Sequence, residues 1–167
     1  DGLIMVWNKD PKVLRLECSI LTSSPIICFT SDDNTLFSGH FSGKICEWNI
    51  RLGKKFQEFD ALDGPVRSLV TDGSMLASGN ENGVIRVWSR HHGAWRHKFT
   101  LSEHIGWVRC LATCDGKLLS GSNDRTIKVW DFVTGQLEAT LLAHKDTVTG
   151  VVVHRQRIYS CSTDGTV

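Results

Sequence analysis

The feature that most constrains this chain is a motif of about 40 residues that recurs along its whole length. Tryptophans mark the motif at positions 7, 48, 88 and 130, which are 41, 40 and 42 residues apart. A serine stands ten residues before each of the last three tryptophans, and a further serine keeps this register near the end: Ser38, Ser78, Ser120 and Ser160. A chain of 167 residues with such a period is built from repeated units rather than around one unrepeated core.

Within one unit the sequence predicts four short strands. The segments WVRCLAT, KLLSG, TIKVW and QLEATL are apolar or alternating, and Gly, Asp, Asn and Ser separate them. No segment has the 3.6-residue period of an amphipathic helix. Units of this length with four short strands are typical of β-propeller blades, in which neighbouring sheets bury each other. We therefore expect an all-β fold of four-stranded antiparallel blades.

Composition predicts a folded, soluble chain and excludes few partners. The hydrophobic fraction is 41%, no apolar run is long enough to span a bilayer, and no signal-peptide pattern opens the sequence. A formal net charge of +1 gives no general preference for nucleic acid or membranes. We expect an intracellular location, in the cytoplasm or nucleus, and no membrane attachment.

The six cysteines are expected to be free thiols in a reducing compartment. None forms a Cys-x-x-Cys pair, and most lie in strand-like segments, where a thiol behaves as a small apolar group. The alternative is a zinc site of Cys110, Cys114 and a nearby histidine, but further ligands do not follow at a finger-like spacing. We therefore expect no metal and no cofactor.

The stretch SGSNDRTIKVWDF, preceded by EHIGWVRCLA, resembles the repeats of the WD-repeat family of β-propellers, and the resemblance covers essentially the whole chain. It implies that residues 65–71, 74–79, 83–88 and 95–100 are the inner-to-outer strands of one blade. Three complete blades and two partial ones are implied: about 18–60, 61–100 and 101–142, flanked by 1–17 and 143–167.

We interpret the chain as a piece of a longer propeller, because rings of this family most often have more blades than the repeats present here. The alternative is a ring of four blades, closed by pairing the first and last fragments. In that ring DGLIMVW and DGTV would compete for one strand position.

By the same resemblance, a hydrogen-bonded His, Ser, Asp and Trp tie the strands of a blade together. The residues implied are His104, Ser120, Asp124 and Trp130 in one blade, and His144, Ser160 and Asp164 in the next. Two earlier blades depart, with Thr22 and Leu62 at the His register and Ser42 and Asn82 at the Asp register, so we expect them to depend more on packing. A catalytic triad uses the same residue types, but a set that recurs from blade to blade fits a structural brace.

Two departures from the repeat are candidate contact points. Glu47 occupies the register of Val6, Val87 and Val129, where a carboxylate must reach water or a partner. We expect it to extend to solvent, with a contact to another subunit as the alternative. The stretch RVWSRHHGAWRHKF concentrates positive charge on an outer hairpin: Arg86, Arg90, His91, His92, Arg96, His97 and Lys98. A cationic outer strand discourages edge-to-edge aggregation, and it is also a candidate site for an acidic partner or an RNA backbone.

We interpret the chain as a non-catalytic scaffold or adaptor that presents loops to other proteins within a multi-subunit complex. The resemblance places a partner-binding face around the central channel, at registers occupied by Trp107, Thr147, Phe41, Glu81, Asn123 and Thr163. Trp107 is the expected anchor, because a tryptophan at a strand mouth offers a large contact area.

More specific functions follow from shorter stretches. WNIR, Trp48 to Arg51, is similar to a box that docks onto ubiquitin-ligase adaptors, which favours a substrate receptor of a ubiquitin ligase. The alternatives are an RNA-binding component of a ribonucleoprotein, through residues 86–98, and a regulatory propeller fused to an enzyme such as a kinase.

Overall fold

A computed structural model describes residues 2–7, 15–32, 35–62, 64–142 and 144–167, with only the backbone of Cys18. All regular elements in these ranges are β-strands, and none of the described residues forms a helix long and apolar enough to cross a membrane. Three four-stranded antiparallel sheets have their strands in chain order: β3 (Ile26–Ser31), β4 (Thr35–His40), β5 (Lys44–Asn49) and β6 (Lys54–Asp60); β7 (Val66–Thr71), β8 (Met75–Asn80), β9 (Ile85–His91) and β10 (Ala94–Leu101); β11 (Val108–Cys114), β12 (Lys117–Ser122), β13 (Ile127–Asp131) and β14 (Leu137–Leu141). Two-stranded sheets flank them: β1 (Gly2–Trp7) with β2 (Leu16–Thr22), and β15 (Val148–His154) with β16 (Arg157–Ser162).

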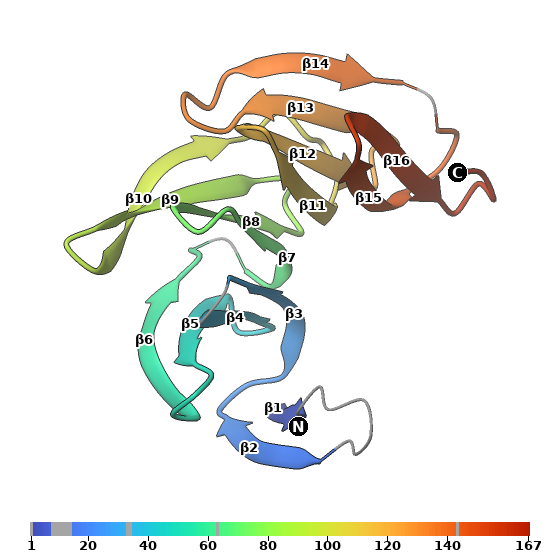
Figure 1. The fold of residues 1–167 in the computed structure, drawn as a ribbon. Coiled ribbons are helices and arrows are strands. Elements are labelled where there is room, and N and C mark those ends of the chain that lie inside the picture. Colours follow the sequence, from blue (N-terminus) through green and yellow to red (C-terminus); the bar gives the residue numbers. More distant parts are fainter. Residues whose placement is uncertain (1, 8–14, 33–34, 63, 143) are drawn as a thin grey trace.

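The sheets are blades arranged along an open arc (Figure 1). The first strand of each complete blade lies on the inner side of the arc and the fourth on the outer side, and successive first strands contact one another. The sheet of β1 and β2 stays separate from that of β15 and β16, so the described strands do not close as four blades. The expected partial propeller of three complete and two partial blades is confirmed.

The first partial blade is longer than the sequence predicted. β2 pairs with β1 from Leu16 to Thr22, so the expected boundary at residue 17 falls inside a strand. The hairpin partner satisfies the backbone of β2, which therefore belongs to this blade and not to the next. Residue 143, where the last boundary was expected, lies outside the described residues.

The apolar core lies between blades rather than within one sheet. One cluster joins Phe37 and Ile45 of the second blade to Val66, Trp88 and Trp95 of the third. A second cluster joins β8 and β9 to β11, β12 and β13 in the same way. In the complete blades β7–β10 and β11–β14, the second strand is the most buried and the fourth the most exposed, which explains why the former reads as an apolar run and the latter as a mixed sequence.

A glycine of one blade faces a valine of the next at the closest approach between sheets. The glycine follows the repeat serine, and the valine opens the next first strand. A Cβ on Gly79 would lie 2.5 Å from Cγ1 of Val108, and one on Gly121 would lie 2.6 Å from Cγ1 of Val148. Gly39 and Val66 repeat the arrangement one blade earlier, also at 2.6 Å. The repeated Ser-Gly pair is therefore a packing requirement, because any larger residue would overlap both the valine of the next blade and a side chain of its own first strand: Cys28, Ser68 or Cys110.

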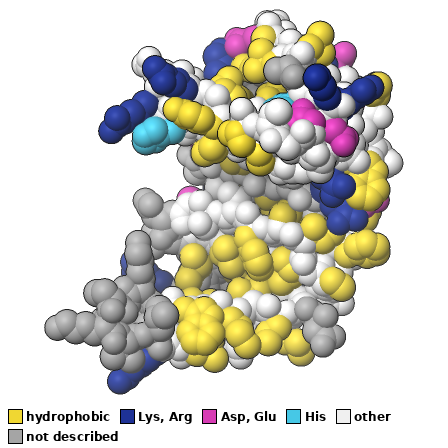
Figure 2. All heavy atoms as spheres, turned by 90° about the vertical axis from the view of Figure 1, so that its right-hand side faces the viewer, with side chains coloured by type: hydrophobic (Ala, Val, Ile, Leu, Met, Phe, Trp, Pro, Cys, Tyr) yellow, Lys and Arg dark blue, Asp and Glu magenta, His cyan; other side chains and the backbone are white. Residues whose placement is uncertain are grey.

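Apolar side chains are exposed on both partial blades. Trp7 is 55% exposed, whereas the tryptophans at the same register in the complete blades are buried. One hollow on the first partial blade and its neighbour is lined only by hydrophobic residues: Leu3, Ile4, Met5, Phe29 and Leu36. Figure 2, in which the right-hand side of Figure 1 faces the viewer, shows hydrophobic side chains gathered over the lower part of the molecule, where β1 to β6 lie. These surfaces lack the cover that a complete blade receives from its neighbours.

We expect Gly79→Ala to lower the free energy of unfolding by about 1–3 kcal/mol, because the new methyl group would overlap a Val108 methyl group. Val108→Ala removes Cγ1, although the Val108 Cβ would still lie 2.8 Å and Ser68 Oγ 2.6 Å from the new methyl group. The double variant should therefore regain part of the loss and lose less stability than the sum of the two single losses. Urea denaturation of the four proteins measures this coupling. Strict additivity would show that the glycine is not required by the neighbouring valine.

Candidate partner-binding face

Four side chains form one hydrogen-bonded chain in the blade of β11 to β14. Trp130 Nε1 lies 2.9 Å from Ser120 Oγ, and Ser120 Oγ lies 2.7 Å from His104 Nε2. His104 Nδ1 lies 2.7 Å from Oδ2 of Asp124. This hydrogen-bond network joins the second and third strands to the loop before β11 and to the turn before β13.

Each hydrogen bond in this network has a defined donor and acceptor. An indole only donates, so the Ser120 hydroxyl accepts from Trp130 and donates to Nε2 of His104. Nδ1 of His104 then donates to the Asp124 carboxylate. Burial lowers the pKa of His104, although Asp124 acts in the opposite direction. The pKa of Asp124 is also lowered: burial acts to raise it, but hydrogen bonds from Thr126 and His104 outweigh burial. The pair is a neutral imidazole beside an ionised carboxylate.

The same bonds place the serine out of reach of a substrate. Ser120 is fully buried, and its hydroxyl is held between Trp130 and His104. The last blade repeats the arrangement, with His144 Nε2 at 2.8 Å from Ser160 Oγ and His144 Nδ1 at 3.2 Å from Asp164 Oδ2. The geometry is that of a brace and not of an exposed nucleophile.

A histidine from a different register completes the brace in the blade of β3 to β6. His40 Nε2 lies 2.8 Å from Ser38 Oγ, and His40 Nδ1 donates to the carbonyl of Ser24 at 3.1 Å. Trp48 Nε1 donates to Ser38 Oγ at 2.7 Å. The sequence did not predict this brace, in which a backbone carbonyl takes the place of the Asp; the greater dependence of this blade on packing stays a prediction. The only sequence signal of this brace is a histidine two residues after the repeat serine.

The blade of β7 to β10 has a shorter brace. Trp88 Nε1 donates to Ser78 Oγ at 3.4 Å, and the described residues place no histidine on that serine. The turn is held instead by Oδ1 of Asn80, which accepts from the backbone of Asn82 at 2.9 Å and of Val84 at 3.0 Å.

A β-bulge near the start of each first strand sets one residue out of the regular pairing. The register shifts between Val66 and Ser68 and again between Val108 and Cys110, so the extra residues are Arg67 and Arg109. Bulges re-aim side chains at sheet edges. Here they place one arginine from each of two neighbouring blades beside the loops that surround Trp107.

Both arginines lie against the ring of Trp107. The guanidinium carbons of Arg67 and Arg109 each lie 4.9 Å from the centroid of the Trp107 ring. Glu81 pairs with Arg67 at 2.7 Å from Nε, and Oδ1 of Asn123 accepts from Nε of Arg109 at 2.8 Å. Cation–π contacts of this kind favour a fixed orientation. We call this surface the loop face: Arg67, Glu81, Ile105, Trp107, Arg109 and Asn123.

The loop that carries Ile105 and Trp107 is fixed from both sides. The backbone N–H of Ile105 donates to Asp124 at 3.2 Å, and the N–H of Asn123 donates to the carbonyl of Trp107 at 2.9 Å. Gly83 of the preceding blade has a φ of +78°, and a Cβ there would lie 2.3 Å from the carbonyl oxygen of His104. The brace and the neighbouring blade therefore both position this loop.

The remaining residues predicted for the binding face lie in other blades. The N–H of Phe41 donates to the carbonyl of Pro25 at 2.9 Å, and that of Thr163 to Thr147 at 3.0 Å, which repeats the turn contact of Asn123. Within the described part of the chain, no hydrogen bond or ring contact joins Phe41, Thr147 or Thr163 to Trp107. Sequence reasoning missed Arg67, Arg109 and Ile105, whose positions depend on the bulges and the loop.

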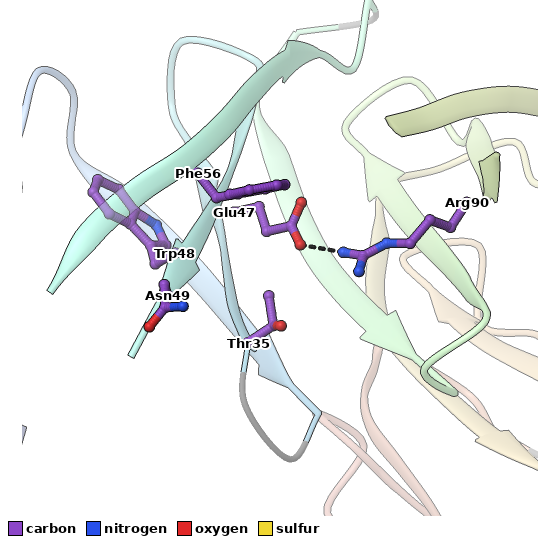
Figure 3. A pocket seen from close by; sticks show the side chains of 6 residues that line it. All are labelled: Thr35, Glu47, Trp48, Asn49, Phe56 and Arg90. Carbon is purple, nitrogen blue, oxygen red and sulfur yellow. Dashed lines mark hydrogen bonds and ion pairs between the residues drawn. The ribbon is translucent and has the colours of Figure 1, made fainter. Parts of the chain in front are cut away.

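Glu47 is buried, which corrects the expectation that it extends to solvent. Its side chain is 3% exposed, and it accepts hydrogen bonds from Arg90, from Gln57 Nε2 at 2.5 Å and from Trp95 Nε1 at 3.0 Å. Figure 3 shows Glu47 and Arg90 pointing at each other across a pocket beside Phe56. Arg90 and Trp95 belong to the following blade, so the carboxylate joins two blades of one chain. A buried carboxylate requires such partners, because an unpaired one is very costly.

The basic outer hairpin is divided by contacts within the chain. Arg90 pairs with Glu47, and Lys98 donates to the carbonyl of Val133 in the next blade at 2.7 Å. The other members differ in their surroundings: Arg86 and His97 contact Thr100, whereas His91, His92 and Arg96 are exposed. Two of the seven residues in the concentration of positive charge expected from the sequence are therefore engaged in links between blades.

Three of the thiols have surroundings that keep them protonated. Burial raises the pKa of Cys28 and of Cys110 to about 12, and that of Cys46 to about 11. Among the described residues, no group of three or more His, Cys, Asp or Glu side chains is placed to hold a metal ion. The zinc alternative at Cys110 and Cys114 thus lacks a ligand set there.

A comparison with protein families decides the identity of this fold. The profile of the WD domain, G-beta repeat, matches residues 53–89, 95–131 and 135–167, which is more than half of the chain. The chain belongs to the WD-repeat family. The first two matched WD repeats each run from the fourth strand of one blade to the third strand of the next, so each sequence repeat bridges two blades.

Individual relatives of this WD-repeat chain are similar over part of their length. It is 42% identical over 71 residues to the pre-mRNA-splicing factor PRP46 of Saccharomyces cerevisiae, covering 41% of the chain and 16% of that protein. It is 32% identical over 150 residues to apoptotic protease-activating factor 1 of Homo sapiens, covering 84% and 12%. Among solved structures, the computationally designed Ika8 protein has a TM-score of 0.82 and 27% identity, covering 99% of this chain and 54% of that one. The chain thus spans less than a fifth of the length of the two natural relatives.

We expect the stability of the protein to fall as the pH is lowered from about 7 to about 5. Because the folded-state pKa values of His104 and His40 are lowered, the folded chain binds fewer protons than the unfolded chain below about pH 6.5, and unfolding takes up protons. His104→Ala should cost about 1–3 kcal/mol near neutral pH and make the pH dependence shallower. Urea denaturation across this pH range measures both effects.

The control for this prediction is Asn82→Ala, in the blade whose repeat serine, Ser78, has no histidine partner among the described residues. The Asn82 side chain is exposed, so the loss should be smaller than that of His104→Ala. Equal losses in the two variants, or a rise of wild-type stability on acidification, would contradict the role given to the buried histidines.

Proposed function

We propose that this chain is a non-catalytic scaffold that binds partner proteins through the loop face. WD-repeat proteins typically mediate protein–protein interaction, which gives the general class. The observation that carries the finer proposal is the stack of Arg67, Trp107 and Arg109. A large aromatic ring held in one orientation by two neighbouring blades is a good anchor, because little conformational entropy is lost when a partner covers it.

Binding within a multi-subunit complex fits the rigidity of this surface. The residues of the loop face come from two blades and are joined by hydrogen bonds and ring contacts, so the surface is formed before a partner arrives. The similarity to a splicing factor supports an intracellular location in the nucleus or cytoplasm as part of the same proposal.

The RNA-binding alternative has less support. Phosphate-backbone binding needs several cations along one surface. Arg90 and Lys98 of the outer hairpin already serve contacts between blades. We therefore place the main binding surface at the loop face and not at residues 86–98.

The ubiquitin-ligase function rests on the WNIR stretch alone. In that stretch Trp48 is buried and donates to Ser38, and the preceding Glu47 is paired with Arg90, so only part of the stretch reaches the surface. No contact of the described residues favours this function over other scaffold functions. A regulatory propeller attached to an enzyme such as a kinase would use the same loop face.

We expect Trp107→Ala to weaken the retention of proteins that bind this chain by at least about tenfold, because truncation of an aromatic anchor typically costs about 2 kcal/mol or more. The measurement is quantitative mass spectrometry of proteins retained by the immobilised wild-type chain and by each variant. Glu81→Lys should also change retention, because it reverses the charge beside Arg67.

The matched control is Arg96→Ala, an exposed residue on the outer strand of the same blade as Arg67. Melting temperatures of all variants establish that the fold is retained. Loss of binding in Arg96→Ala together with full retention in Trp107→Ala would assign the interaction to the basic hairpin instead.

A further inference from the structure

The two arginines of the loop face differ in how their charge is balanced. Arg67 forms an ion pair with Glu81, and both side chains are mostly buried. Arg109 is exposed and has no carboxylate partner among the residues that the structure describes. Its Nε donates to a neutral amide oxygen of Asn123, and its guanidinium lies over Trp107. The face therefore has one oriented positive charge that nothing in the described chain neutralises.

The orientation of Arg109 leaves its outer edge available. Asn123 takes the Nε proton, and no described residue accepts a hydrogen bond from the two Nη atoms. The outer edge of a guanidinium offers two parallel N–H donors, a geometry that matches a carboxylate. Because the bulge, the amide and the ring already hold the side chain, binding a carboxylate there requires little further ordering.

An apolar contact point lies on the same loop. Ile105 is 94% exposed, yet its backbone N–H is bonded to Asp124. An exposed isoleucine on a pinned loop is costly to leave in water and offers a rigid surface for an apolar side chain. Between the two preceding blades, Leu62 in the loop before β7 and Phe41 in the turn between β4 and β5 are also exposed, at 64% and 57%.

We propose that the loop face binds a protein segment in which an Asp or Glu side chain stands beside a large apolar side chain. The carboxylate pairs with the Nη edge of Arg109, and the apolar side chain covers Ile105 and the accessible part of Trp107. This inference rests on the proposed function and adds the chemistry of the partner. A nucleic acid fits less well, because the face presents a single uncompensated cation rather than a row of them.

The test is a selection of random dodecapeptides displayed on phage against the immobilised full chain. The expected result is a selected pool enriched in Asp and Glu next to Leu, Ile or Phe, relative to the unselected library. Individual selected peptides should bind Arg109→Glu on the order of tenfold more weakly or worse, because a charge-assisted pair is lost. Arg96→Glu makes the same charge change at an exposed site on the outer hairpin and should bind them as the wild type does.

Glu81→Gln provides an independent test, in which the binding of acidic peptides should increase. It removes the carboxylate that neutralises Arg67, so peptides with two acidic residues should be selected more strongly than by the wild type. Should Arg109→Glu melt at a lower temperature than the wild type, Arg109→Gln, which removes the charge and keeps much of the side chain, replaces it in the comparison.

Several outcomes would overturn the proposal: a pool without acidic enrichment, the absence of any selected peptide, equal losses in Arg109→Glu and Arg96→Glu, or tighter binding of a short single-stranded RNA than of the selected peptides. The variant Trp107→Ala separates this proposal from the proposed function. Selected peptides that require Trp107 but carry no acidic residue would leave the loop face as the binding site and remove only its acidic preference. Selected peptides that bind Trp107→Ala undiminished would remove both.

Discussion

A valine at the start of each of the first strands β7, β11 and β15 fills the space beside a glycine in the second strand of the preceding blade. This contact sets how closely two sheets approach, and it recurs at Gly39 with Val66, Gly79 with Val108 and Gly121 with Val148. Sheet-to-sheet burial supplies the core, because a four-stranded sheet of this size cannot bury its own faces. Every other feature of the molecule is positioned by this step from blade to blade.

Polar contacts also join neighbouring blades. Glu47 and Arg90 join the second and third blades, and Lys98 joins the third to the fourth through a backbone carbonyl. The brace of His104, Ser120 and Asp124 holds the loop that meets Gly83 of the preceding blade. Packing brings the loops together and the hydrogen bonds then orient them, so that the loop face has a fixed shape without a partner.

The period of the sequence was sufficient to predict the fold. Strand length, turn residues and the Trp register are local properties, and they led to four-stranded blades whose strands agree with the structure to within a few residues. The boundary at residue 17 was wrong because it followed the repeat and not the hairpin that pairs β2 with β1.

The site could be predicted only in part. Trp107, Glu81 and Asn123 stand at registers that the repeat identifies, although their role in binding a partner stays a prediction. Arg67 and Arg109 required knowledge of the bulges, which leave no mark in composition or period. The Glu47–Arg90 pair joins residues 43 positions apart on different blades, and such a contact depends on the distance between sheets that no local pattern reports.

The central claim is that packing between blades holds the loop face in its binding shape before any partner is present. Native-state hydrogen exchange of individual amides tests it most directly. The N–H groups of Ile105 and Asn123, which bond to Asp124 and to the carbonyl of Trp107, should open with the same free energy as the amides of β11 and β12. Exchange of these two amides at the rate of an unstructured loop, while the strands stay protected, would contradict it.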